Sequence, residues 1–193
     1  MTSNIHLVLT TLVIKGTSMA KEIVLLRGEI ATVDDDDYEG LFKYKWRRSH
    51  WGYVIRSFLV YEDGKVFTGK KKRGRKGKQK VIWMHRQIMG FPKEEVDHVD
   101  GNPLNNQKNN LRLCSSAQNK WNQRKRKGIH SSKYKGVRFD KRAGKGKPWT
   151  ARITINYVEF NLGQFETEED AARAYDKEAF EQFGGFARLN FSQ

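Results

Sequence analysis

Residues 96–122 read Val-Asp-His-Val-Asp-Gly-Asn-Pro-Leu-Asn-Asn-Gln-Lys-Asn-Asn-Leu-Arg-Leu-Cys-Ser-Ser-Ala-Gln-Asn-Lys-Trp-Asn, and this stretch decides the centre of the fold. An acid–imidazole pair, Asp97-His98, opens it, and a loop rich in glycine, proline and asparagine follows. A short apolar segment, Leu111 to Cys114, leads to a helix start at Ser115-Ser116. This order predicts a strand, a tight loop, a second strand, and a helix packed across both strands.

The two ends of this unit carry side chains that suit phosphodiester hydrolysis. Asn119 and Asn122 lie one turn apart on the expected helix and therefore share a face. Because the fold unit brings its ends together, we expect Asp97, His98 and Asn119 to meet around one metal ion. An imidazole can deprotonate water, and a divalent ion held by oxygen ligands neutralises charge on a phosphate.

The same stretch resembles the H-N-H nuclease motif, in the form found in phage and intron homing endonucleases. His98 matches the first His of the motif, Asn110 the middle Asn, and Asn119 the last position, where the homing branch often has Asn. The likeness covers residues 83–125 and includes Trp83-Met84-His85-Arg86-Gln87-Ile88-Met89-Gly90 and Asp100-Gly101-Asn102-Pro103-Leu104. The chain departs from one subgroup, because it has no Cys pairs for a structural zinc.

The resemblance implies roles for four residues. His98 is expected to act as the general base, and Asn110 to brace the loop that orients it. Asp97 and Asn119 are expected to hold one divalent ion, Mg²⁺ or another such as Mn²⁺, since oxygen ligands suit hard cations. Two interpretations of His85 stay open: a packed, hydrogen-bonded core residue, which is the commoner role of a His on an apolar strand, or a member of the site.

The chain is strongly basic. Its 193 residues include 37 Lys and Arg against 22 Asp and Glu, a formal net charge of +15. That charge favours nucleic acid over a membrane as partner, although a basic protein can also be merely soluble. Double-stranded DNA is the partner that we expect from the nuclease resemblance. Cys114 is the single Cys, which excludes a disulfide framework and fits an intracellular compartment, the bacterial cytoplasm if a phage encodes the chain. We expect a monomer without a small-molecule cofactor.

Neither a membrane span nor a signal peptide is expected. The apolar run Leu7 to Ile14 is far shorter than the roughly 20 residues that cross a bilayer, and no basic segment precedes it. Residues 1–18 are interpreted as an extension of doubtful relevance, since Met19 would be an ordinary start. We expect an N-terminal module plus nuclease at 19–127, a linker at 128–133 and a DNA-binding domain at 134–193. The expected class is α+β: a β-rich module, a ββα-metal nuclease fold, then a three-stranded antiparallel sheet on one helix.

The N-terminal module is expected to contain strands and one short helix. Residues 22–33 predict a strand pair broken at Arg27-Gly28, and residues 38–44 predict the helix. Asp34-Asp35-Asp36-Asp37 between them favours a solvated turn that caps this helix, rather than a metal site. Aromatic residues between positions 46 and 58 predict further strands.

Two basic runs flank the motif. Residues 69–80 have no apolar face, so we expect a hairpin loop whose Lys71 and Lys72 contact phosphates without sequence preference; a nuclear localisation signal is the weaker alternative. Arg124 and Arg126 end the nuclease helix and are expected to lie along a phosphate backbone. The alternative is a solvated helix end whose cations complement the helix dipole.

Residues 134–163 contain three segments in which apolar and polar residues alternate. Apolar residues share one face, and they are Val137, Phe139, Trp149, Ala151, Ile153, Ile155, Val158, Phe160 and Leu162. The pattern predicts a three-stranded antiparallel sheet with one polar face. Thr167-Glu168-Glu169-Asp170 predicts the start of a helix whose small alanines face the sheet, and Gly184-Gly185 predicts its end.

This segment resembles the APETALA2/ethylene-response-factor DNA-binding domain. Matching pieces are Tyr134-Lys135-Gly136-Val137-Arg138, Trp149-Thr150-Ala151-Arg152-Ile153, Leu162-Gly163-Gln164-Phe165, residues 167–176 and residues 187–191. In that family the polar sheet face lies in the DNA major groove. The resemblance therefore implies DNA contacts by Arg138, Lys141, Arg142, Thr150, Arg152 and Thr154. Glu159 and Asn161 depart from residues common in plant members, so the target sequence cannot be copied from them.

The leading interpretation is a site-directed DNA endonuclease of the homing type, which nicks or cuts both strands. Its central motif would cut, and its C-terminal sheet would choose the site. The first alternative is a DNA-binding regulator with a nuclease-like fold that does not cut; such a protein would be expected to lack Asp97, His98 or Asn119, and all three are present. An RNA-binding protein is a third interpretation, which predicts stacking aromatics on an exposed sheet face.

Overall fold

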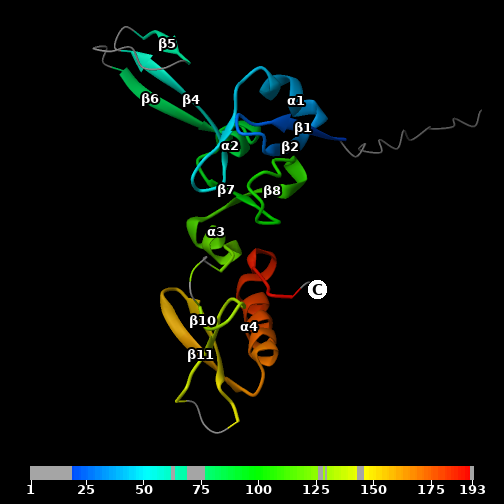
Figure 1. The fold of residues 1–193 in the computed structure, drawn as a ribbon, viewed down its shortest axis with the longest axis vertical. Helices are drawn as coiled ribbons and strands as arrows, with labels where there is room; N and C mark the ends of the chain where they lie inside the picture. Colours follow the sequence, from blue (N-terminus) through cyan, green and yellow to red (C-terminus); the bar gives the residue numbers. More distant parts are fainter. Residues whose placement is uncertain are drawn as a thin grey trace, which may run out of the picture.

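A computed structural model of the chain describes residues 19–61, 64–68, 77–125, 128, 130–142 and 146–191. The doubtful extension at 1–18 and three residues expected to contact phosphate, Lys71, Lys72 and Arg126, lie outside these described residues. The described chain forms two lobes along its long axis, with the N-terminal elements in one and the last sheet and helix in the other (Figure 1). The result is a mixed α/β protein with several small sheets.

The first lobe is built from two small antiparallel sheets and a helix. Strands β1 (Ala20–Val24) and β2 (Ile30–Asp34) pair as a hairpin, and α1 (Asp35–Phe42) follows directly. The second sheet consists of β3 (Arg47–Arg48), β4 (Val54–Tyr61), β5 (Val66–Phe67) and β6 (Gly77–Trp83). Strand β4 pairs antiparallel with each of the other three.

A strand–loop–strand–helix unit comes next, between the two lobes. Helix α2 (Met84–Ile88) leads to β7 (Glu95–His98), and a loop containing the 3₁₀ turn η1 (Lys108–Asn110) leads to β8 (Leu111–Cys114). Strands β7 and β8 pair antiparallel, and α3 (Ser116–Asn122) follows. A capping box between Ser115 and Gln118 starts α3 by satisfying its first backbone N–H groups.

The first lobe and the loop of this unit share one hydrophobic core. Its buried members are Ile23, Leu25, Ala31, Val33, Leu41, Trp46, Val54 and Met84, and Leu104 of the loop packs against them. Backbone hydrogen bonds join the same parts: Thr32 N donates to Leu104 O (2.9 Å), and Asn106 N donates to Thr32 O (2.7 Å). The N-terminal hairpin therefore helps to shape the loop between β7 and β8.

The four aspartates at positions 34–37 do not form the solvated turn that was expected. Helix α1 begins at Asp35 rather than Tyr38, and three acidic residues in its first turn complement the helix dipole. Asp34 stands at the N-cap, but its side chain makes no capping hydrogen bond. This buried carboxylate instead accepts hydrogen bonds from Gln107 Nε2 (3.1 Å) and Lys108 N (2.8 Å). Asp34 thus fixes the far end of the same loop.

The second lobe consists of one sheet and one helix. Strands β9 (Val137–Phe139), β10 (Trp149–Ile155) and β11 (Val158–Phe165) pair antiparallel in the order β11-β10-β9. Helix α4 (Glu168–Phe183) packs on this sheet and ends in the 3₁₀ turn η2 (Gly184–Phe186). Gly136 allows the close approach of sheet and helix, because an added Cβ would lie 2.0 Å from a ring carbon of Tyr175.

The burial of this sheet differs in part from what alternation predicts. Thr150, expected on the open polar face, is 2% exposed, whereas the apolar Val158 and Phe160 are 55% and 47% exposed. Phe160 stands opposite the buried Ile153, and Val158 stands opposite Ile155, so the expected apolar face is present. Alternation predicts the side of a strand, but not which part of that side is covered.

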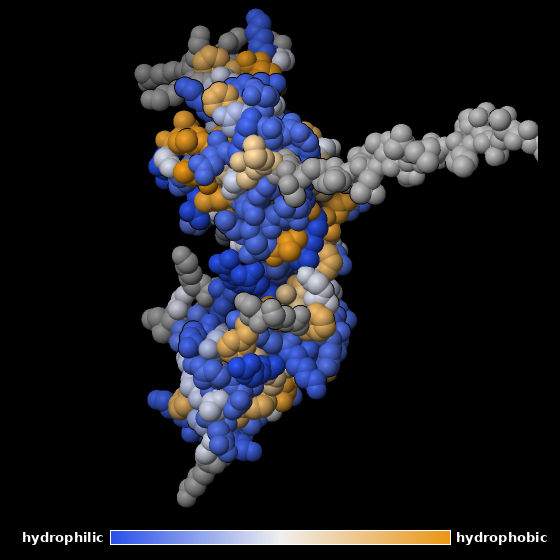
Figure 2. Space-filling view, turned by 90° about the vertical axis from the view of Figure 1, so that its right-hand side faces the viewer, coloured by the Kyte–Doolittle hydropathy of each residue, from blue (hydrophilic) through white to orange (hydrophobic). Residues whose placement is uncertain are grey.

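The surface is rich in hydrophilic residues, as expected for a chain with 31% charged residues (Figure 2). Figure 2 shows a mostly hydrophilic face in which apolar residues form small separate groups. Among the described residues, no helix is both long enough and apolar enough to cross a membrane.

Candidate active site

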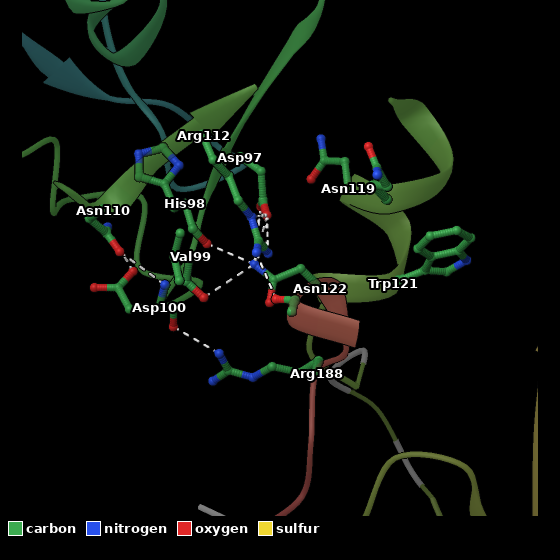
Figure 3. A network of polar contacts seen from close by, with 12 residues as sticks. Asp97, His98, Val99, Asp100, Asn110, Arg112, Asn119, Trp121, Asn122 and Arg188 are labelled. Carbon is green, nitrogen blue, oxygen red and sulfur yellow. Dashed lines mark hydrogen bonds and ion pairs between the residues drawn. The ribbon is translucent and has the colours of Figure 1, made fainter. Parts of the chain in front are cut away.

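Strand β7 presents its acids and its imidazole on opposite sides. Because side chains alternate along a strand, Glu95 and Asp97 face one way and His98 the other. Figure 3 shows Asp97 directed toward α3 and the ring of His98 directed away from it. The acidic side and the imidazole side therefore have separate sets of partners.

On the acidic side, two asparagines of α3 meet two carboxylates of β7. Asn119 Nδ2 donates to Glu95 Oε2 (2.6 Å), and Asn122 Nδ2 donates to Asp97 Oδ1 (3.1 Å) and Oδ2 (3.0 Å). Asn122 Nδ2 also donates to the backbone oxygen of His98 (2.8 Å). The shared face expected of Asn119 and Asn122 is present, but the described partner of Asn119 is Glu95, whereas Asp97 meets Asn122.

Asp97 is also held by an arginine on the neighbouring strand. Arg112, its cross-strand partner, donates from Nε (3.0 Å) and from a terminal nitrogen (2.8 Å) to Asp97 Oδ2. The other terminal nitrogen of Arg112 donates to the backbone oxygen of Gly185 (2.7 Å), and its guanidinium lies 3.9 Å from the ring centre of Phe186. Arg112 thereby connects Asp97 to the turn that follows α4.

The imidazole of His98 is buried, with 4% exposure, among three side chains of other elements. Its ring centre lies 5.1 Å from that of His85 and 5.8 Å from that of Tyr53. Asn106 Oδ1 lies 3.4 Å from His98 Nε2, at the long end of the range for a hydrogen bond. Burial lowers the pKa of His98 below its ordinary value, although the contact with Asn106 and nearby carboxylates oppose this effect.

The hydrogen bonds of Asn106 favour one tautomer of His98. Asn106 Nδ2 donates to Pro103 O (3.1 Å), so its oxygen is the atom that faces His98. An amide oxygen can only accept, so this 3.4 Å contact suits the Nε2–H tautomer of His98. The lone pair then lies on Nδ1, the atom able to take a proton.

Asn110 closes the loop between β7 and β8. Its Nδ2 donates to Asp100 Oδ1 (3.0 Å) and to Asn105 O (2.8 Å), and its Oδ1 accepts from Asp100 N (3.0 Å). Its backbone oxygen accepts from Val99 N (2.9 Å). These contacts tie the residues that directly follow His98 to the start of β8.

The acidic side has the donor chemistry of a site for a hard divalent cation. It combines carboxylates of β7 with amides of α3, and such cations prefer oxygen ligands. Asp97 Oδ1 accepts one hydrogen bond, from Asn122, and so has a lone pair left for a metal, whereas Oδ2 already accepts three. No three His, Cys, Asp or Glu residues in the described part of the chain gather as a metal-binding group. An amide oxygen would therefore have to complete the ligand set, and Asn119 and Asn122 are the amides at hand.

The residues expected to contact DNA are placed unevenly. Lys141, Arg142, Arg138 and Thr154 are exposed, as is Arg124 just beyond α3. Arg152 is half-buried and forms an ion pair with Glu159 on the neighbouring strand. Thr150 is buried, so this structure does not present it to a ligand.

Several residues around the site were not found from sequence. Arg112 could have been found by aligning the two strands of the hairpin, because it stands opposite Asp97. Glu95 could have been found from strand alternation, because it shares the face of Asp97. Nothing in the sequence pattern indicated Asn106 beside His98 or Asp34 beneath the loop.

Comparison with known proteins identifies the family of the chain. Residues 76–120 match the model of a family described as HNH endonuclease. The chain is 31% identical over 171 residues to a protein of Acanthamoeba polyphaga mimivirus named Uncharacterized HNH endonuclease L560, covering 85% of this chain and 76% of the relative. It is also 33% identical over 94 residues to Protein 3.8 of Escherichia phage T7, covering 49% of this chain and 74% of that protein. The chain belongs to the HNH endonuclease family.

The two kinds of match differ in extent. The family model ends at residue 120, before the C-terminal sheet. The alignment with the mimivirus protein covers too large a share of this chain to leave out all of residues 134–193. The resemblance of that segment to the APETALA2/ethylene-response-factor domain rests on the sequence motifs given above.

Proposed function

We propose that this protein is a metal-dependent DNA endonuclease in which His98 is the general base. The observation that carries the proposal is the position of His98 on β7. Its neutral ring is held by Asn106 with the lone pair on Nδ1, directly after the carboxylate that faces α3. Family membership and the basic surface support nucleic acid as the substrate.

In this mechanism His98 Nδ1 removes a proton from the water that attacks the phosphorus, the P–O bond to the departing nucleotide oxygen breaks, and that oxygen takes a proton from solvent. Asp97 and Asn119 would hold one divalent cation, Mg²⁺ or Mn²⁺, which supplies positive charge to stabilise the phosphate during attack. Asn110 keeps the residues after His98 in place through its bonds to Asp100 and Asn105. His98 is buried and lies on the opposite side of β7 from Asp97 (Figure 3), so this mechanism requires the site to open and bring His98 and the cation ligands to the same phosphate.

The C-terminal sheet would direct the enzyme to its site. Thr154, Lys141 and Arg142 are exposed and available to DNA, whereas the exposed Arg138 pairs with Asp140 (3.6 Å). Arg152 would first have to exchange Glu159 for a base or a phosphate. The resemblance to the APETALA2/ethylene-response-factor domain and to the homing branch of the family supports site-directed cutting.

A specific observation favours a second candidate, a DNA-binding protein of nuclease-like fold that does not cut. His98 is 4% exposed, and Asp97 is already neutralised by Arg112. Cleavage by the wild-type protein would exclude this candidate.

The test is incubation of host or phage DNA with the protein and Mg²⁺ or Mn²⁺, followed by sequencing of the ends. His98→Ala should lower the cleavage rate by about 10²–10⁴-fold while DNA binding persists. His50→Ala is the matched control, because His50 is exposed and lies outside the site. Undiminished cleavage by His98→Ala would sink the assignment of the base.

A further inference from the structure

Two arginines, one from the nuclease unit and one from the C-terminal lobe, converge beside the loop that follows His98. Arg124, just after α3, donates to the backbone oxygen of Asp100 (3.2 Å), and Arg188, after η2, donates to the same oxygen (2.9 Å). A Cβ added to Gly101 would lie 3.2 Å from a terminal nitrogen of Arg188 and 3.5 Å from Arg124 Nε. Figure 3 shows Arg188 reaching up to Asp100 from the chain beneath α3.

Among the described residues, no carboxylate lies within ion-pair distance of either arginine, although the charges of Asp100 and Asp97 act on Arg188 from farther away. The carboxylate of Asp100 is used within its own loop, where it accepts from Asn102 N (2.7 Å), Asn105 Nδ2 (2.9 Å) and Asn110 Nδ2 (3.0 Å). Within the described residues, neither Arg124 nor Arg188 forms an ion pair. Both guanidiniums therefore share a single neutral acceptor, and most of their five N–H groups remain available.

A third cation adds to the positive charge. Lys135 Nζ donates to the backbone oxygens of Trp121 (2.6 Å) and Gln123 (2.8 Å), at the end of α3. Burial lowers the pKa of Lys135 to about 8, and the charge of Arg188 contributes to this shift. Burial and the charge of Arg124 likewise lower the pKa of Arg188, whereas the carboxylates of Asp100 and Asp97 oppose this shift. Like charges held this close favour the binding of an anion between them.

The backbone around Arg188 is fixed, so its position is part of the fold. Arg188 N donates to Trp121 O (3.3 Å), and Asn190, two residues on, donates to Asp176 of α4 and to Lys135 O. The ring of Phe183 stacks on Trp121 of α3, with centres 4.4 Å apart. The C-terminal lobe thus holds Arg188 against the nuclease loop.

We propose that Arg124 and Arg188 form a clamp for one phosphate of the nucleic acid backbone, next to the nuclease site. A planar guanidinium donates two parallel hydrogen bonds to phosphate oxygens, and two guanidiniums can hold one phosphate from both sides. The C-terminal lobe then supplies a substrate-binding residue to the nuclease unit itself. The ligand rests on the proposed function, which makes DNA the substrate.

The test is binding of a short, fluorescent DNA duplex of random sequence, without metal, at several salt concentrations. Arg188→Gln and Arg124→Gln should each weaken binding about tenfold and lower the slope of log K against log [salt] by about 0.9, the value for one lost phosphate contact. The double variant should lower the slope by about 1.8. Arg173→Gln, which removes the same charge from an exposed position of α4, should leave the slope unchanged.

Arg188→Lys keeps the positive charge but removes the planar guanidinium. It also provides a second variant in case Arg188→Gln does not fold. It should keep the wild-type slope but bind about threefold more weakly, since a lysine cannot donate two parallel bonds. Thermal unfolding checks that each variant is folded. If Arg188→Gln behaves as Arg173→Gln does, the clamp is refuted.

Competition with inorganic phosphate alone distinguishes a site for free phosphate from a site for the DNA backbone. Inorganic phosphate should displace the duplex no better than chloride does at equal ionic strength. Tight, saturable binding of inorganic phosphate with an unchanged DNA slope in the variants would overturn the proposal. Because binding is measured without metal, the phosphate clamp and the nuclease activity are tested independently. If the wild-type protein binds DNA as predicted but never cleaves it, only the proposed nuclease activity is refuted.

Discussion

His85 should make the stability of this protein sensitive to acid. Its side chain is 5% exposed and lies beside His98, and burial together with nearby positive charge lowers the pKa of His85 from 6.5 to about 3. Below the ordinary pKa of histidine, the unfolded chain takes up a proton that the folded protein does not. The free energy of unfolding therefore falls as the pH drops from 6.5 toward about 3, and the full contribution is present above 6.5.

The size of the loss in unfolding free energy follows from this pH range, between 6.5 and about 3. Each pH unit inside it removes about 1.4 kcal/mol of stability. Acidification from about pH 7 to about pH 5 crosses about 1.5 units, which corresponds to a loss of about 2 kcal/mol from His85. His98 also has a lowered pKa and adds a loss of the same sign.

The variant His85→Phe isolates the contribution of this residue. A phenyl ring can occupy the aromatic surroundings of His85, formed by Tyr53 and Trp83, and cannot take up a proton. Urea unfolding at both pH values, followed by circular dichroism, should show that the variant loses about 2 kcal/mol less than wild type, with the loss from His98 common to both. His50→Phe changes an exposed histidine and should behave as wild type. Equal losses in wild type and His85→Phe would refute the buried, neutral state of His85.

Three further predictions test other parts of the molecule. Asp97→Ala or Asn119→Ala should raise the Mg²⁺ concentration needed for half-maximal cleavage, and EDTA should stop the wild-type enzyme; cleavage in EDTA would indicate a metal-free nuclease. Gly136→Ala should destabilise the C-terminal lobe by at least about 2 kcal/mol in thermal unfolding, because the new Cβ meets Tyr175 and the backbone φ is +76°. Arg138→Ala should weaken binding to the native site more than to scrambled DNA, by roughly 1–3 kcal/mol of discrimination; equal losses on both duplexes would leave the sheet as a purely electrostatic contact.

The nuclease unit could be predicted from sequence because its determinants are local. Strand β7, the loop, strand β8 and helix α3 follow one another within residues 95–122, so spacing and capping residues indicate them directly. The shared face of Asn119 and Asn122 follows from helix geometry alone. Which carboxylate each asparagine meets depends on how far α3 slides along β7, and spacing alone does not determine that distance.

The contacts that were missed join residues far apart in the chain. Asp34 reaches Gln107 and Lys108 across more than 70 positions, and Arg188 reaches Asp100 across 88. Such pairs leave no periodic signal, because each depends on the packing of whole elements. The burial of Thr150 has a similar origin, since alternation predicts the side of a strand but not what covers it.

The packing of the nuclease unit against the C-terminal lobe also changes the roles that we expect for these two parts. Sequence suggests that a cutting unit and a targeting domain are joined by a linker, so that deleting residues 131–193 would leave a weaker, less selective nuclease rather than a dead one. In the structure Trp121 of the nuclease helix stacks on Phe183 of α4, and Arg112 contacts the backbone of Gly185 while it holds Asp97. Removing the second lobe would expose Trp121 and free Arg112 on that side, and it would remove Arg188 from the loop after His98. The C-terminal lobe is therefore part of the framework of the nuclease site, and its loss should impair the positioning of Asp97 as well as the choice of DNA.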